Sequence, residues 1–487
     1  MQDEIQVLRE ENAALREENA TLRALVAELL PLKTQVEQLS TQVKQLESRL
    51  AKDSHNSHLP PSSDRFARQP RTKSLRKPSG KKPGAQAEHE GNTLYQVIEP
   101  DQVIVHPVEI CACCKHDLRQ EPTLGIERRQ VLDLPPKRVV VVEHQAQQKY
   151  CPHCQQISRA AFPEGVGAPV QYSPAFAAVG VYLVQQQLLP YERACETIQD
   201  LIGPSMSVGT LKGWVERCAQ HLEPVEQEIK AHLHTSRVLH QDESGLYVMG
   251  KRMWMHVSAT ETLTHYAVHA KRGSEALQAI GILPGFEGIS VHDGWTSYWL
   301  YGCLHALCNV HHLRELIFLH EQEHQEWAAE MKTLLGLMHE AVQQAKAAGL
   351  PQLNPLEVAD WKAQYEAILE QGWQANPPDP PAADGVLRRG RQKQSAARNL
   401  LTRLSKHQDA VLRFLDNFCV PFDNSQAERD IRMVKVQQKI SGGFRSLAGA
   451  EAFCRIRGYL STLRKQGGQV LTALELALAG HPVSPAF

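Results

Sequence analysis

The chain has 487 residues, of which 42% are hydrophobic and 22% charged, and its formal net charge is −1. This composition is that of a globular protein, and the length suits roughly three or four domains. No apolar run approaches the ~20 residues that span a bilayer, and the first residues, MQDEIQVLREENAAL, lack the apolar core of a signal peptide. The eleven cysteines, with two close pairs, suit metal binding in a reducing compartment. We therefore expect a cytoplasmic protein.

Residues 1–50 carry a heptad pattern that is typical of a coiled coil. Leucines recur every seven residues, and two asparagines share the companion positions of the seam: Leu8, Leu15, Leu22 and Leu29 with Ile5, Asn12, Asn19 and Val26. In parallel dimers such buried asparagines fix register and strand number. Pro31 is expected to interrupt the seam, which then resumes in a shifted phase. We expect a homodimer or higher oligomer; the alternative is one amphipathic helix packed on the body.

Residues 51–92 predict a disordered, basic linker, because they have little to bury and abundant Pro, Ser and Lys. Residues 61–84 hold eight Lys or Arg and one acid. Such an arm can release counterions from a phosphate backbone, so Lys77, Lys81 and Lys82 are candidate DNA contacts. A plain linker is the alternative.

Residues 93–165 contain two cysteine knuckles, CACCKHDL and CPHC, with strand-like sequence at residues 138–150 between them. Two Cys-x-x-Cys pairs can offer four thiolates to one tetrahedral zinc ion, which would be structural because no coordination position stays open. We assign Cys111, Cys114, Cys151 and Cys154 as ligands. Cys113 is then the spare cysteine, and His116 or His153 could substitute.

Residues 166–232 predict helices. One helix ends at a turn containing Gly203 and Pro204, and a second begins after a capping Ser207. The spacing suits a DNA-binding helix-turn-helix. The second helix carries few basic residues, however, so an ordinary helical hairpin is an equal alternative.

Residues 233–320 change pattern to three β-like runs joined by short turns, then a helix (274–281), a strand (288–295) and a fifth strand leading into a helix. This order describes the first part of a ribonuclease-H-like α/β core. Asp242 lies within the first strand and Asp293 at the end of the fourth. These strands are neighbours in such a sheet, so we expect the two carboxylates to converge.

Convergent carboxylates suit hard divalent cations, and a third acid would allow two Mg²⁺ (or Mn²⁺) ions to act on a phosphodiester. The best third acid is Glu428, on a helix predicted at residues 422–440 and capped by Asn424 or Ser425, whose basic face carries Arg429, Arg432 and Lys435. Three other acidic residues are alternatives to these assignments. Glu243 points to the opposite face by strand alternation, Asp430 lies about 200° around the helix from Glu428, and Asp423 precedes the helix and could reach in.

Several of these motifs occur in a familiar order: NSHLPPSSD, GKKPGAQ, the paired knuckles, LPYERACE, DES, HDGW and DNSQAERDIR. Over residues 1–465 the chain resembles the transposases of bacterial insertion sequences of the sixty-six family. The resemblance implies a DDE-type recombinase with catalytic acids Asp242, Asp293 and Glu428. It also implies a helical insertion (321–410), core helices (411–465), and a C-terminal helix and tail (466–487).

The expected protein is thus a multidomain α/β transposase, with a ribonuclease-H-like core preceded by a coiled coil, a zinc-binding β module and a helical region. Its expected partners are transposon-end DNA, target DNA and accessory proteins of the same element. A nuclease or resolvase of the same fold, or an inactive zinc-containing DNA-binding protein, are the alternatives. One departure from the family pattern is LCNVHHLREL, where Cys308, His312 and Arg314 replace a tryptophan–histidine pair; His312 either approaches the phosphate or packs in the core.

Overall fold

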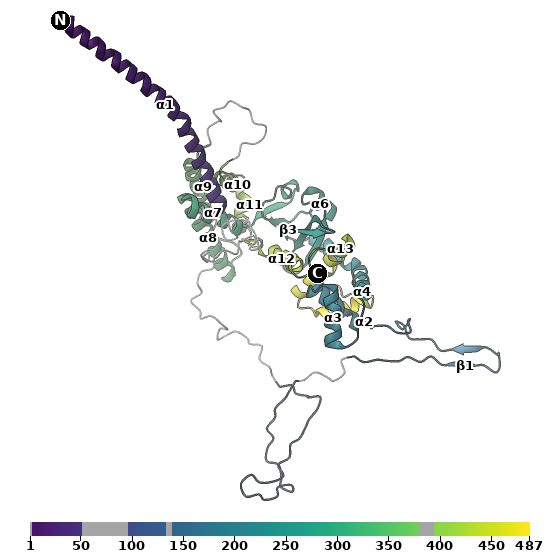
Figure 1. The fold of residues 1–487 in the computed structure, drawn as a ribbon. Helices are drawn as coiled ribbons and strands as arrows, with labels where there is room; N and C mark the ends of the chain where they lie inside the picture. Colours follow the sequence, from purple (N-terminus) through teal and green to yellow (C-terminus); the bar gives the residue numbers. More distant parts are fainter. Residues whose placement is uncertain (1, 51–95, 133–138, 379–393) are drawn as a thin grey trace. The chain divides into compact units, whose positions relative to one another are not determined.

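The computed structural model describes residues 2–50, 96–132, 139–378 and 394–487. The chain divides into two compact units. One consists of residues 73–171 and 198–205, and the other contains the remaining residues (Figure 1). The basic arm with Lys77, Lys81 and Lys82 and the proline-rich segment from residue 379 lie outside the described residues. Within the described ranges no helix is both long and apolar enough to cross a membrane.

The N-terminal helix α1 (Gln2–Leu50) runs through Pro31 without a break, so the expected shift in the phase of the seam would occur within one continuous helix. A proline removes one backbone hydrogen bond, and an exposed carbonyl can bond to water instead. The seam residues that are described are exposed in this single chain, for example Leu15 and Leu22 at 56% and 55%. At these positions the apolar side chains of the α1 seam are therefore not packed against another part of the same chain.

The unit that carries the knuckles has little regular structure. Strands β1 (Gln148–Tyr150) and β2 (Ile157–Arg159) pair antiparallel around the second knuckle. The strand expected over residues 138–150 is confirmed only at its end, since the valines at 140–142 are exposed and unpaired. β-branched residues favour an extended backbone, but a strand also needs a partner for its ladder.

The expected helices and turn between residues 174 and 234 are present: α2 (Pro174–Val181), the π-helix η2 (Tyr182–Gln186), α3 (Tyr191–Ile202), α4 (Val208–His221) and α5 (Glu223–His234). Ser207 caps α4 as predicted, with its Oγ accepting from the Thr210 N–H at 3.0 Å. One face of α4 is buried through Leu211 and Trp214, and the opposite face exposes Lys212 and Arg217. This amphipathic packing fits both the helical hairpin and the helix-turn-helix interpretations.

A five-stranded sheet positions the candidate site. Its order is β5-β4-β3-β6-β7, with the first three strands antiparallel and the β3–β6 and β6–β7 pairs parallel. The order of strands and helix along the chain agrees with the sequence prediction. The bounds are β3 (Val238–Val248), β4 (Lys251–Ala259), β5 (Thr264–His269), α6 (Ser274–Ile280), β6 (Ile289–His292) and β7 (Leu304–Leu307).

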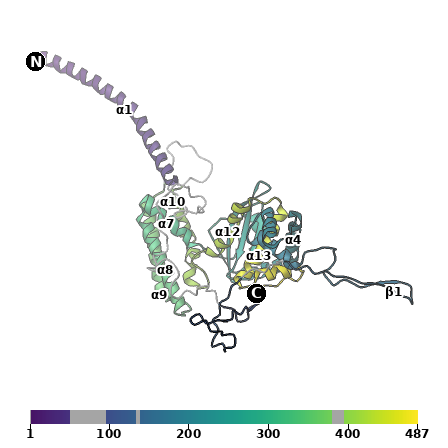
Figure 2. The ribbon, with the colours of Figure 1, turned by 60° about the horizontal axis from the view of Figure 1, so that its bottom comes forward.

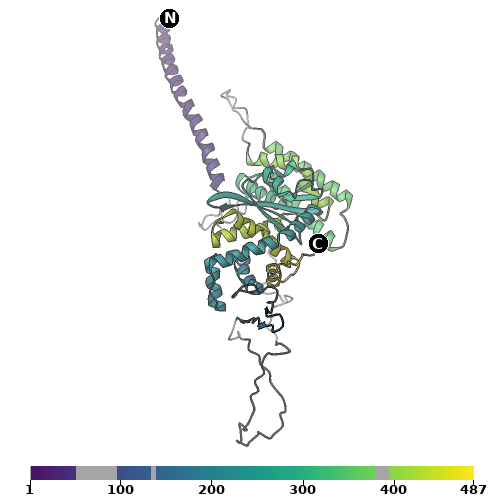
Figure 3. The same ribbon diagram turned by 90° about the vertical axis from the view of Figure 1, so that its right-hand side faces the viewer.

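Helices cover both sides of this sheet and form three apolar clusters. Helices α12 and α13 pack on β3, β4 and β5 (Figures 2 and 3). A second group of helices, α7 to α11, packs together and against β7 (Figure 2). The bounds are α7 (Asn309–Glu323), α8 (Glu326–Ala347), α9 (Pro355–Ala375), α10 (Ala396–Lys406), α11 (Gln408–Asp416), α12 (Ser425–Ser441), α13 (Leu447–Lys465) and α14 (Val470–Leu478).

Candidate active site

Asp242 and Asp293 occupy equivalent positions on neighbouring parallel strands. His240 on β3 pairs with Val291 on β6, so two residues further along each strand the same register brings Asp242 opposite Asp293. Side chains alternate faces along a strand, and both carboxylates therefore leave the sheet on the same side. Asp293 directly follows the buried strand β6, and the register with β3 places it close to Asp242.

A tight turn fixes the carboxylate of Asp293 at the end of β6. Gly294 has φ +91°, a conformation that glycine adopts without steric cost, and its N–H donates to His292 Nδ1 at 3.0 Å. The next amide, of Trp295, donates to Asp293 Oδ1 at 2.8 Å. These bonds leave the second carboxylate oxygen of Asp293 for another partner.

Buried histidines support this turn from below. His292 Nε2 lies 3.0 Å from His305 Nδ1, and His305 Nε2 lies 3.1 Å from the Tyr301 carbonyl. Since His292 Nδ1 accepts from Gly294, its Nε2 must donate to His305, which in turn donates to Tyr301. Burial, with smaller contributions from His305 and His407, holds the pKa of His292 well below its usual value. Both rings therefore serve as neutral, oriented supports.

Asn424 anchors the start of α12 next to Asp242. It was expected to cap this helix, but its side chain makes no capping bond. Instead its amide N–H donates to the Gln241 carbonyl at 2.7 Å, and its Oδ1 lies 2.9 Å from His240 Nδ1. The residue is 1% exposed. One helical turn later, at i+4, Glu428 projects from the same side of the helix toward the strand ends.

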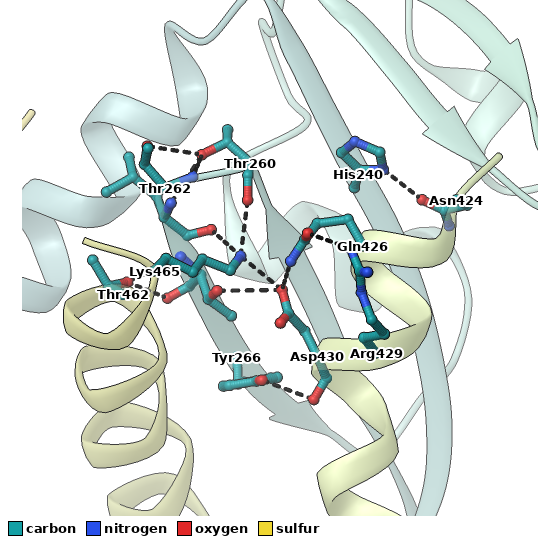
Figure 4. A network of polar contacts seen from close by, with 12 residues as sticks. His240, Thr260, Thr262, Tyr266, Asn424, Gln426, Arg429, Asp430, Thr462 and Lys465 are labelled. Atoms are coloured by element: carbon teal, nitrogen blue, oxygen red, sulfur yellow. Dashed lines mark hydrogen bonds and ion pairs between the residues drawn. The ribbon is translucent and has the colours of Figure 1, made fainter. Parts of the chain in front are cut away.

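The opposite side of α12 is held by the network in Figure 4. Asp430 pairs with Lys465 of α13 at 2.8 Å and accepts from Thr264 Oγ1 of β5 at 3.3 Å. Its backbone carbonyl accepts from Tyr266 at 2.8 Å. Asp430 is therefore an ion-pair partner within the fold, and these contacts hold the side of α12 that packs on β5 and α13.

Asp293 and Glu428 lie close enough to Asp242 to affect its ionisation. The pKa of Asp242 is raised well above its usual value, first by burial and then by the charges of Glu243, Asp293 and Glu428. Burial also raises the pKa of Glu428, against the opposing charge of Arg314. Among the described residues, no basic side chain opposes this rise in the pKa of Asp242. In the described part of the chain the ligand oxygens of Asp242, Asp293 and Glu428 do not all lie within 4.8 Å of one another, and a divalent cation bound between them would offset the repulsion that raises the pKa of Asp242.

Replacing Asp242 with asparagine is expected to stabilise the metal-free protein at neutral pH. Burial gives Asp242 a higher pKa in the folded state than in the unfolded state. The free energy of unfolding therefore falls as pH rises from the unfolded pKa to the folded pKa, and it stays lower at every pH above the folded pKa. Asparagine removes this loss, by on the order of 1 kcal/mol or more, which is a few degrees in Tm. Thermal unfolding in EDTA between about pH 4 and pH 8 measures it. A variant that melts at or below the wild type at neutral pH would contradict the inferred repulsion.

The rivals Glu243 and Asp423 are engaged in structural contacts. Glu243 accepts from Arg272 Nε at 2.7 Å and from the Tyr298 hydroxyl at 2.6 Å, and its side chain is 2% exposed. It points away from the α12 face, as strand alternation predicted. Asp423 accepts from the Ser425 N–H at 2.8 Å at the start of α12. Their charges still affect the candidate site: the charge of Glu243 raises the pKa of Asp242, and the charge of Asp423 raises the pKa of Glu428.

From the sequence, His311 was missed as a neighbour of Glu428, and Cys308 was noted only as part of the departure from the family pattern. Cys308 Sγ lies 3.9 Å from Glu428 Oε1 and accepts from the Asn424 N–H at 3.2 Å, while His311 Nε2 lies 3.6 Å from the same oxygen. The donor atoms of Cys308, His311 and Glu428 all lie within 4.8 Å of one another, which is close enough for a shared metal ion. The signal available was the Cys-x-x-His spacing at the start of α7, which places both residues on one helical turn.

His312, considered earlier as a phosphate contact, is a core residue. It is 1% exposed and its Nδ1 lies 3.1 Å from Asn309 Oδ1. On α12, Arg429 and Arg432 are exposed, whereas Lys435 is half-buried and donates to the Gly245 carbonyl at 2.7 Å. The first two remain available to a phosphate backbone, and Lys435 already contributes to packing.

The two cysteine knuckles adopt the same backbone conformation. In each, the amide of the first cysteine donates to a carbonyl five residues later, and the residue after the second cysteine has positive φ: Lys115 at 64° and Gln155 at 55°. Within each knuckle, backbone and side-chain hydrogen bonds lower the pKa of the first cysteine, Cys111 or Cys151. In the described part of the chain no three of the four sulfurs gather within 4.8 Å. Thiolates in matched knuckles are a donor set that suits zinc.

A Cys111→Ser variant is expected to lose zinc. One of four thiolates would be removed, and a site with three ligands and a water holds the ion more weakly. Zinc per chain, measured by mass spectrometry of the intact protein, should fall toward zero after dialysis. Cys113→Ser is the matched control and should keep the wild-type content. Unchanged stoichiometry in Cys111→Ser would refute the ligand assignment.

These features define the class of the protein. It is a multidomain α/β protein with a five-stranded sheet that carries acidic residues and a separate unit that carries two cysteine knuckles. A sequence profile described as the transposase IS66 family matches residues 169–452, more than half of the chain. The chain belongs to this family. The profile of the zinc-finger binding domain of IS66 transposases matches residues 109–155, which supports zinc binding, and a family of unknown function matches residues 9–94. Curated proteins gave no match.

Proposed function

We propose that the protein is a DDE-type transposase, which cleaves transposon ends to expose 3′ hydroxyls and joins these to target DNA. Asp242, Asp293 and Glu428 would be the catalytic acids. The observation that supports this proposal is the register of β3 and β6, which brings Asp242 within β3 opposite Asp293 just after β6, together with the effect of the Glu428 charge on the pKa of Asp242. Both reactions are phosphoryl transfers that need no covalent enzyme intermediate, so positioning and electrostatics supply most of the catalysis.

The sheet supports a ribonuclease-H-like core. Three antiparallel strands, a helix and two further strands parallel to the first give the order β5-β4-β3-β6-β7. Helices α8 to α10 fall between the second aspartate and Glu428 in sequence, where the family resemblance places its insertion. The helices of the insertion share one apolar cluster with β6 and β7, for example with Val291 and Leu307, and with helices α7 and α11.

The carboxylates would hold two divalent metal ions. When bound, such ions activate the attacking oxygen and stabilise the leaving oxygen of the phosphodiester. The chain's own residues provide the frame. Asn424 and the Asp430–Lys465 pair orient Glu428, and Asp293 is fixed by the turn at Gly294.

Other segments would bring DNA and protomers together. Exposed Arg429 and Arg432 lie one and four residues beyond Glu428, where they can contact phosphates next to the cleaved bond. The exposed seam of α1 would pair protomers in the cytoplasm, as bridging two DNA ends requires. The basic arm, the zinc unit and the α3–α4 region would add contacts to the ends, and accessory proteins of the element would join the assembly.

A strand-joining assay tests the proposal. Labelled duplexes carrying the DNA that flanks this chain's coding sequence are incubated with the full-length protein, Mg²⁺ and a target plasmid. A transposase yields both nicked ends and labelled plasmid. A nuclease or resolvase cuts without joining, and a non-catalytic DNA-binding protein retards the duplex without cutting it; either result would refute the proposal.

A further inference from the structure

Two arginines and two tryptophans form a ladder of stacked side chains beside the acids. The guanidinium of Arg272 lies 3.9 Å from the ring centroid of Trp295 and 5.1 Å from that of Trp254. Arg252 lies 4.6 Å from the Trp254 ring. The stack Arg252–Trp254–Arg272–Trp295, called here the Trp–Arg ladder, joins the start of β4, the loop after β5 and the turn after β6.

The inner part of the ladder is rigidly held. Glu243 Oε1 accepts from Arg272 Nε at 2.7 Å and lies 2.7 Å from Arg272 Nη2, and Glu243 Oε2 accepts from the Tyr298 hydroxyl. A guanidinium fixed in this way keeps its flat faces toward the two indoles. The ladder is therefore preorganised, and little conformational entropy would be lost when a further planar group stacks on it.

The ladder reaches the acids at its inner end. Trp295 follows Asp293 by two residues, and its amide donates to the Asp293 carboxylate at 2.8 Å. Glu243, which holds Arg272, leaves β3 on the opposite face from Asp242, so Trp295 is the member of the ladder that lies next to the acids. A nucleotide stacked on the ladder would thus lie next to a phosphodiester held by the acids.

The outer part of the ladder is exposed and cationic. Trp254 and Trp295 are half-buried, and Arg252 is exposed. Among the described residues Arg252 forms no ion pair with an acid, and its positive charge, after burial, lowers the pKa of Lys435. Exposed indoles next to an uncompensated arginine attract a ligand that combines a flat ring with negative charge.

The tryptophan nearest the acids is also held without a side-chain hydrogen bond. In the described part of the chain its indole Nε1–H has no acceptor, whereas Trp299 donates to the Gly294 carbonyl at 3.4 Å. Stacking and packing alone therefore hold the Trp295 ring. A base could stack on this ring without breaking a hydrogen bond of the indole. This favours a role in binding over a purely structural one.

We propose that the Trp–Arg ladder binds unpaired nucleotides of the transposon end beside the cleaved bond. One base would stack on Trp254 in place of the Arg252 guanidinium, another would stack on the face of Trp295 that Arg272 leaves open, and the displaced Arg252 would pair with a phosphate. This rests on the proposed function, since it takes the DNA end as the ligand of the site. A phosphodiester reaches buried acids more easily when its flanking bases leave the duplex, and stacking on aromatic rings offsets the lost pairing.

Photo-crosslinking tests the subsite without catalysis. End duplexes carry 5-iododeoxyuridine at single positions around the cleavage point and are bound by full-length Asp242→Asn protein in Ca²⁺. Irradiation joins the iodinated base to an aromatic side chain stacked on it, and peptides are identified by mass spectrometry. We expect crosslinks at Trp254 or Trp295 from bases next to the cleaved bond. Crosslinks from these positions that map only elsewhere would overturn the proposal.

Cleavage kinetics provide the second test. Trp254→Ala and Trp295→Ala should each slow cleavage of fully paired ends about tenfold, and ends with mismatched flanking bases should recover most of the rate. Phe at either position should retain the paired-end rate within a few-fold. Trp361→Ala, a half-buried tryptophan on α9, is the matched control. Wild-type rates in both alanine variants, or equal losses on paired and mismatched ends, would overturn the subsite. Failure of the wild type to cut any end would refute the transposase proposal, while the crosslinks would still report on the ladder.

Discussion

Asp242→Asn, Asp293→Asn and Glu428→Gln are each expected to abolish end cleavage and strand joining, with a rate loss of at least about a thousandfold. Each change replaces one anionic oxygen ligand by a neutral amide of the same shape, so the site loses affinity for a hard cation without losing its packing. DNA retention in a gel assay should be unchanged. Single-turnover cleavage of labelled ends, at saturating protein, measures the loss.

Asp430→Asn is the matched control for these three variants. It also removes a carboxylate from α12, but one that pairs with Lys465 at 2.8 Å on the far side of the helix. The variant should melt earlier, because a partly buried ammonium loses its partner. Because the Asp430–Lys465 pair also orients Glu428, the variant's cleavage rate per folded molecule should fall by about tenfold, far less than the loss in the first three variants. Normal cleavage by any of the first three variants would remove that residue from the catalytic set.

The sheet was predictable because its signals are local. Alternation in RVLHQDESGLYV placed Asp242 and Glu243 on opposite faces, and the structure gives each a separate environment: α12 on one face, Arg272 and Tyr298 on the other. The short runs after it fixed the strand sequence. The proximity of Asp242 and Asp293 then followed from strand order, because equivalent ends of parallel neighbours meet at one edge.

The surroundings of Glu428 were not predictable in the same way. Cys308 and His311 reach it because the start of α7 meets the start of α12, where the Asn309 N–H donates to the Phe422 carbonyl at 3.0 Å. No periodicity within one segment encodes such a contact between segments more than a hundred residues apart. The sequence also gave Asn424 a capping role, which is its commonest use near a helix start, while tertiary hydrogen bonds took the side chain instead.

The Trp–Arg ladder escaped sequence analysis for the same reason. Its four side chains come from three segments, and each alone resembles an ordinary aromatic or basic residue near a turn. Zinc binding was easier to predict, since the pairs Cys111–Cys114 and Cys151–Cys154 are local motifs. Motifs that close within a few residues are visible in sequence, and sites assembled by the tertiary fold are not.

Asn424→Ala is expected to weaken both the fold and the active site. The change leaves the buried Gln241 carbonyl without its 2.7 Å donor and removes the partner of His240 Nδ1. An unsatisfied buried group costs about 1–3 kcal/mol, so the free energy of unfolding should fall by roughly 2–5 kcal/mol. Because Asn424 fixes the start of α12, Glu428 should also lose its position, with cleavage slowed about 10- to 100-fold, as is typical when a support of a metal ligand is removed.

A positioning role can be separated from simple destabilisation by titrating the metal. If Asn424 orients Glu428, the Mg²⁺ concentration for half-maximal cleavage should rise in Asn424→Ala at a temperature where the variant is fully folded, and excess Mg²⁺ should restore part of the rate. Asn417→Ala, which removes an amide that bonds only to the Cys419 N–H near the end of α11, should leave the Mg²⁺ requirement unchanged. An unaltered requirement in Asn424→Ala would mean that α12 holds Glu428 in place without this anchor, and that the Asp430–Lys465 network alone sets the geometry of the site.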